Sequence, residues 1–197
     1  MSLRRSLPVV FVLALSAPLL AGEFDRVEGE RLGSLIREGL VEPRRALTVN
    51  AIEAIPQAFP DVRSAFLVVK TGEGNLARLL ISPGFRKPAS GNRPPVPVVV
   101  VERFDTFEPG RSGSRPARGA NLVLFEGFPL DLDTGRVVPE GQGGDLLLRP
   151  GSKDGGRLEP LGGSMIFVPK KPIPAEPGRG GPSPGNTVVP GDFAGRY

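Results

Sequence analysis

The stretch AFLVVKTGEGNLARLLI, residues 65–81, decides the fold. Residues 65–69 are apolar on both faces of an extended chain, as in a strand that is packed on two sides. Residues 71–74, Thr-Gly-Glu-Gly, have the composition of a turn, and a second apolar run reaches Ile81. Residues 72–77 also match the GxGxxA pattern of dinucleotide-binding loops, but Pro83 and Gly84 leave no room for the helix that such a loop requires. The stretch therefore predicts an antiparallel hairpin.

Short apolar runs continue beyond this hairpin. They are separated by Gly, Pro, Asn and Asp, and they predict strands at residues 98–104, 122–125, 130–133, 136–138, 146–148 and 165–168. Many short strands with frequent turns are typical of an antiparallel sandwich or a small barrel. The expected fold class is therefore mainly β, with the β domain over residues 63–169.

The segments on either side of this domain have a different texture. Residues 22–62 are expected to form a short N-terminal helical lead-in, because Leu32, Leu35 and Ile36 lie on one helix face before Gly39. A second short helix is expected to begin after Thr48 and to end before Pro56. Residues 170–197 are rich in Pro and Gly, and we expect a disordered C-terminal tail there.

Residues 1–21 have the layout of a secretory signal peptide. Arg4 and Arg5 precede an uncharged, mostly apolar run over residues 7–20, and the small residue Ala21 follows. This run is too short to cross a bilayer, so no transmembrane segment is expected after cleavage. We expect a periplasmic or secreted protein with an envelope or extracellular partner. Arg far outnumbers Lys, which is compatible with a GC-rich bacterial genome.

The composition limits the chemistry. The chain has no His and no Cys, which excludes an imidazole base, a thiol nucleophile, a zinc finger and a disulfide. A metal site would have to consist of oxygen ligands. Between Gly22 and Pro169 the basic and acidic residues are equal in number, so we expect no nucleic-acid partner despite the pI of about 9.9.

One acidic motif stands out beside the predicted strands. Residues 130–135, Leu-Asp-Leu-Asp-Thr-Gly, resemble the start of a calcium-binding loop, and a glycine-rich segment ending in Asp145 follows. Asp131, Asp133 and Asp145 are therefore the candidate metal ligands, with calcium as the possible cofactor. Gly135 occupies the third ligand position of the calcium-loop pattern, and a β-turn between two strands explains the same residues.

The triplet Asp133-Thr134-Gly135 is also similar to the active-site triplet of aspartic proteases. The resemblance implies that Asp133 would share a proton with the same residue of a second copy of the chain. The flanking Asp131 and Arg136 depart from the family pattern.

Three functions follow as expectations. The first is an exported, non-enzymatic β-domain protein that acts as an envelope-associated or interaction module for an unknown ligand. The alternative is a calcium-dependent binding module that uses the Asp cluster, and the second alternative is a dimeric aspartic protease. We assign no catalytic residue, no required cofactor and no oligomeric state from the sequence.

Overall fold

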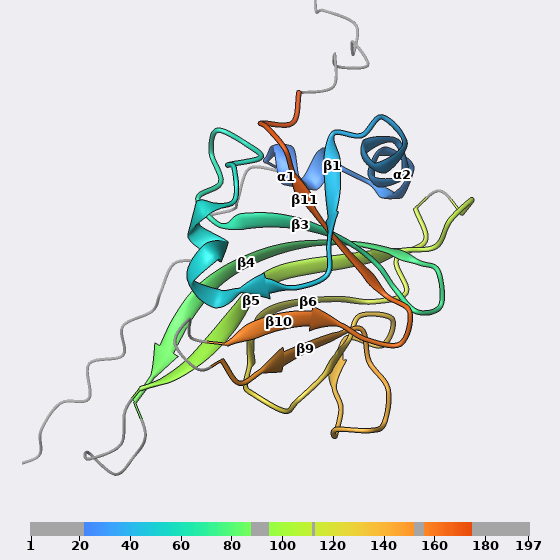
Figure 1. Ribbon diagram of the computed structural model, residues 1–197. Coiled ribbons are helices and arrows are strands. Elements are labelled where there is room, and N and C mark those ends of the chain that lie inside the picture. Colours follow the sequence, from blue (N-terminus) through green and yellow to red (C-terminus); the bar gives the residue numbers. More distant parts are fainter. Residues whose placement is uncertain (1–21, 88–94, 112, 152–155, 175–197) are drawn as a thin grey trace, which may run out of the picture.

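The computed structural model describes residues 22–87, 95–111, 113–151 and 156–174. The predicted signal peptide and most of the predicted tail lie outside these residues. Two antiparallel sheets and three short helices make up the fold (Figure 1). Within the described residues, no helix is long and apolar enough to cross a membrane.

The first sheet has six strands and the second has five. In spatial order, the first sheet consists of β1 (Val41–Arg44), β11 (Met165–Pro169), β3 (Ala65–Lys70), β4 (Leu76–Arg86), β5 (Val96–Phe107) and β6 (Arg118–Leu124). The second consists of β2 (Leu47–Thr48), β10 (Arg157–Pro160), β9 (Leu146–Arg149), β7 (Leu130–Asp131) and β8 (Arg136–Val137). The helices are α1 (Glu23–Arg26), α2 (Gly29–Arg37) and the 3₁₀ helix η1 (Val49–Ala54).

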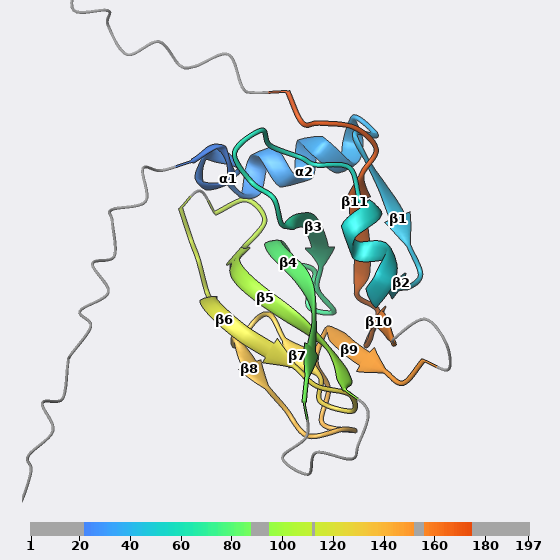
Figure 2. The same ribbon diagram turned by 90° about the vertical axis from the view of Figure 1, so that its left-hand side faces the viewer.

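The side chains of β3 point alternately to the two faces of the first sheet, and both faces are covered, which explains why this strand is apolar on both sides. Leu67 and Val69 enter a core between the two sheets, which also contains Leu146 and Leu158 of the second sheet. Phe66 and Val68 enter a second core on the opposite face of the first sheet. Figure 2 shows α1 and α2 over that face, away from β9 and β10. The fold therefore has three layers, and the mainly β class predicted from the sequence is confirmed.

The predicted hairpin and helices are confirmed, with one difference. β3 and β4 pair through register partners that include Lys70 and Leu76. The first predicted helix is α2, and it is followed by Gly39 with a φ of 65°. The second is η1, but the hydroxyl of Thr48 makes no capping hydrogen bond.

Three strands were not predicted. β1 and β2 lie in the segment expected to be a helical lead-in, and β10 contains a single strongly apolar residue, Leu158. β1 carries Pro43, which an edge strand tolerates because one side needs no ladder hydrogen bonds. At the other end of the chain, Ile173 is buried in the second core and its amide donates to the carbonyl of Ala58. The first residues of the segment that was predicted to be a disordered tail, 170–174, thus belong to the described structure and pack against it.

A buried arginine attaches the helical layer to the first sheet. Arg78 of β4 is fully buried, and its Nε and Nη2 donate to Asp105 of β5 at 3.0 and 2.8 Å. Its Nη1 donates to the carbonyls of Phe24 and Val27, at either end of α1. The guanidinium also lies 4.4 Å from the centre of the Phe24 ring. The carboxylate of Asp105 and two backbone carbonyls thus use nearly all of the donors of this guanidinium.

Replacing Arg78 by Met should destabilise the protein by about 3–5 kcal/mol, because the buried Asp105 loses its shortest ion pair and the carbonyls of Phe24 and Val27 lose the guanidinium as a donor. Urea unfolding followed by circular dichroism measures this loss. Arg86→Met, at the exposed end of the same strand, is the matched control and should cost little. The double variant Arg78→Met/Asp105→Leu should recover part of the loss. An Arg78→Met protein as stable as its control would contradict this account.

Candidate metal centre

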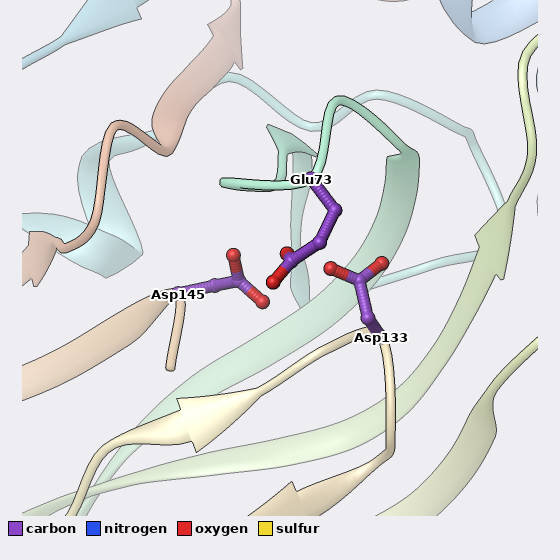
Figure 3. Close-up of side chains that lie close together, drawn as sticks. All are labelled: Glu73, Asp133 and Asp145. Carbon is purple, nitrogen blue, oxygen red and sulfur yellow. The ribbon is translucent and has the colours of Figure 1, made fainter. Parts of the chain in front are cut away.

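Three acidic side chains from separate turns meet at one end of the sandwich. Glu73 lies in the turn between β3 and β4, Asp133 lies between β7 and β8, and Asp145 directly precedes β9. One carboxylate oxygen from each lies within 4.8 Å of the other two. Figure 3 shows the three carboxyl groups pointing toward one another. The fold therefore brings together residues that are up to 72 positions apart in the chain.

Asp145 is a structural carboxylate as well as a member of this cluster. It is 2% exposed, and its Oδ1 accepts hydrogen bonds from the amide of Gly72 (2.9 Å) and the hydroxyl of Ser164 (2.7 Å). Its Oδ2 accepts a bond from the amide of Leu132 at 2.8 Å. Both oxygens of this buried carboxylate are therefore satisfied by donors of the protein itself.

The backbone before Asp145 requires glycine. Gly144 has a φ of 102°, which residues with a side chain rarely adopt. A Cβ at this position would lie 2.8 Å from the Cβ of Pro129. The glycine-rich segment noted in the sequence therefore positions Asp145 at the start of β9.

Asp133 has one satisfied oxygen and one unsatisfied oxygen. Its Oδ1 accepts a hydrogen bond from the side-chain amide of Asn75 at 2.8 Å. Its Oδ2 is buried and has no hydrogen-bond partner among the described residues. A buried carboxylate oxygen without a donor is costly, so this atom needs a proton or a cation beside it.

The proton can come from Glu73. The pKa of Glu73 is raised from 4.5 to about 7, first by a hydrogen bond to Asp133, then by desolvation, and also by the negative charges of Asp133 and Asp145. When Glu73 is protonated, its hydroxyl donates to Asp133. When Glu73 is ionised, three like charges face one another.

Two of the three sequence candidates belong to this cluster. Asp131 lies outside it, since its Oδ1 accepts hydrogen bonds from the amides of Asp133 (2.9 Å) and Thr134 (3.0 Å). Asp131 thus holds the β7–β8 turn that carries Asp133, as the turn interpretation of the motif expects. Glu73 was not among the candidates predicted from the sequence. Residues 71–74 have the composition of a turn, and no local spacing connects this turn to an aspartate 60 residues later.

The donor set suits a hard divalent cation. Three carboxylates supply oxygen ligands only, which calcium, magnesium and manganese prefer. Calcium accepts six to eight oxygen ligands in flexible geometry, and water can complete its shell. A cation would neutralise the repulsion and would contact the unsatisfied oxygen of Asp133.

Comparison of the chain with protein-family models, with curated proteins and with solved structures finds no significant match.

The titration of Glu73 predicts a pH-dependent stability. The folded-state pKa of about 7 lies above the unfolded value of 4.5, so the folded protein binds more protons between these pH values. Without a divalent cation, the contribution of Glu73 to the free energy of unfolding should therefore be largest below about pH 4.5. This contribution should fall as the pH rises and level off above about pH 7. The measurement is the melting temperature across pH 4–8 in the presence of a chelator.

The variant Glu73→Gln should flatten this part of the pH profile. The exposed residue Glu126 provides the matched control, and Glu126→Gln should leave the profile unchanged. Equal slopes for wild type and Glu73→Gln between pH 5 and 7 would show that Glu73 does not titrate in this range.

Proposed function

We propose that this chain is an exported, non-enzymatic β-domain interaction module whose acidic cluster binds a divalent cation, with calcium as the preferred ion. The observation that carries the cation site is the approach of Glu73, Asp133 and Asp145 to within 4.8 Å, together with the buried, unpartnered Oδ2 of Asp133. The second feature distinguishes this cluster from a group of acidic residues that merely share a surface.

The position of the cluster supports a role for the cation in shaping a binding surface. Its members lie in turns of both sheets, and Glu73 and Asp133 approach each other from opposite sides. A cation that holds these turns together would order the end of the sandwich, where loops commonly bind ligands. The proposal is therefore a module whose loop surface is completed by calcium.

Export is the part of the proposal that rests on sequence alone. The charged start, the short apolar run and Ala21 support a cleaved signal, so the partner would lie in the envelope or outside the cell. Mass spectrometry of the protein recovered from the periplasm of a bacterial host tests this. A chain that keeps residues 1–21 and stays in the cytoplasm would contradict it.

The dimeric aspartic protease remains the alternative for the same aspartate. Asp133 already lies beside Glu73 of its own chain, whereas the protease dyad requires Asp133 of a second copy. A monomer in size-exclusion chromatography with light scattering would contradict the protease.

Calcium should raise the melting temperature of the purified protein. A ligand that binds the folded state at about one hundred times its Kd stabilises it by about 2.7 kcal/mol, which corresponds to roughly 5–10 °C for a domain of this size. The measurement is a thermal melt at pH 7.5, first with a chelator and then with millimolar calcium. Sodium chloride of equal ionic strength controls for screening.

Two aspartate variants separate the cluster from its supporting turn. Asp133→Asn should abolish the calcium-dependent shift, because it removes the charge of the unsatisfied carboxylate. Asp131→Asn makes the same chemical change two residues away and should keep the shift, since Asp131 holds the turn and lies outside the cluster. Unchanged melting in calcium, or equal shifts in both variants, would refute the cation site.

A further inference from the structure

A second site lies between η1 and strands of the first sheet. A cavity of about 490 Å³ lies beside this helix. It is lined by Ile52 of η1 and Ile55 directly after it, by Ser64 directly before β3, by Ser82 and Pro83 of β4, and by Glu102 of β5. η1, the cyan helix at the left of Figure 1, contacts both β4 and β5. The volume falls within the range of small-molecule sites. None of the three acidic cluster residues lines this cavity.

The backbone places Glu102 here by an irregularity in β5. In the pairing with β4, Ile81 is opposite Val101 and Leu80 is opposite Arg103, so Glu102 has no partner. In the pairing with β6, Leu122 is opposite Val101 and Ala120 is opposite Arg103, so this register is continuous and the extra residue exists only with respect to β4. A β-bulge of this kind changes the direction of a side chain and commonly lies beside a functional site.

The neighbouring strand β6 also has an unusual backbone beside Glu102. Asn121 lies between the two paired residues of β6 and has a φ of 57°. It is the one residue other than glycine with a positive φ in the described part of the chain. The backbone is thus unusual on two adjacent strands, with an extra residue at Glu102 of β5 and a positive φ at Asn121 of β6.

The carboxylate of Glu102 is held by hydroxyl groups. Ser82 donates to its Oε1 at 2.8 Å, and Ser64 donates to its Oε2. Because each hydroxyl proton is used, the remaining lone pairs of both serines are acceptors. Gln57, which also lines the cavity, donates through its Nε2 to the carbonyls of Pro60 and Val62, so its Oε1 is an acceptor as well.

The charge of Glu102 is not compensated within the described residues. No Arg or Lys of that part of the chain forms an ion pair with it, and Arg103 pairs with Asp25 instead. Arg63 lines the same cavity, but it is exposed and does not pair with Glu102. A partly buried carboxylate surrounded by acceptors and apolar side chains is complementary to a cation that carries an apolar group.

We propose that this cavity binds a protonated organic amine, with its ammonium group at Glu102 and its apolar part against Ile52, Ile55 and Pro83. The ammonium would donate to the carboxylate and to the acceptor lone pairs of Ser64 and Ser82. This site is independent of the cation cluster, and it gives the module a small-molecule ligand of defined chemistry.

The test uses two probes that differ in one group. Leucinamide has an ammonium group beside an apolar side chain, whereas 4-methylpentanamide has the same skeleton without the amine. At pH 6.5, where the amine is protonated, titration of each into the ¹⁵N-labelled protein is followed by two-dimensional NMR. Leucinamide should shift amide signals of residues 52–55, 57, 63–65, 81, 82 and 102, and 4-methylpentanamide should bind at least about tenfold more weakly.

The variants separate a binding role of Glu102 from a structural one. Glu102→Gln should weaken leucinamide binding at least about tenfold and remove the preference over 4-methylpentanamide. Glu126→Gln makes the same change at an exposed site outside the cavity and should leave both affinities unchanged. If Glu102→Gln fails to fold, the comparison of the two probes on the wild-type protein still decides. Equal affinity for both probes, or no shifts around the cavity at millimolar leucinamide, would overturn the proposal.

Discussion

The end of the sandwich that carries the acidic cluster depends on the hydrogen bonds to the carboxylate of Asp145. Its three donors belong to three different turns, carried by Gly72, Leu132 and Ser164. The first turn belongs to one sheet, the second follows a strand of the other, and the third connects the two sheets. A single buried charge thus fixes how these turns lie against one another, and each donor contributes because the carboxylate would be costly to bury without it.

The repulsion among the three carboxyl groups of the cluster does not affect its members equally. Asp145 is fully hydrogen-bonded, so the proximity of three carboxyl groups is relieved at the exposed member, Glu73, whose pKa rises to about 7. The cluster therefore consists of one rigid acid and one acid that changes its charge near neutral pH, with the unsatisfied oxygen of Asp133 between them. A proton and the proposed calcium ion would compete for the same position, so the proposed site would weaken as the pH falls.

The sequence predicted the parts of the fold that local patterns encode. The apolar run of β3 and its turn defined the hairpin, and the spacing of Leu32, Leu35 and Ile36 defined α2. β1 and β10 escaped prediction because pairing with distant strands, rather than their own composition, makes them extended. The same limit applies to the site. The glycine-rich context indicated Asp133 and Asp145, whereas Glu73 joins them only through contacts between turns far apart in the chain.

The pairing of β1 with β11 has a consequence for how the chain reaches its folded state. Val41 is opposite Pro169, so β1 cannot pair until β11 is available. Arg78 likewise donates hydrogen bonds to carbonyl groups more than 50 residues earlier in the chain. Such a topology has a high contact order and folds slowly, because long loops must close before native contacts form. A ribosome delivers the N-terminus first, so the first sheet cannot be completed before residues 165–169 have been synthesised.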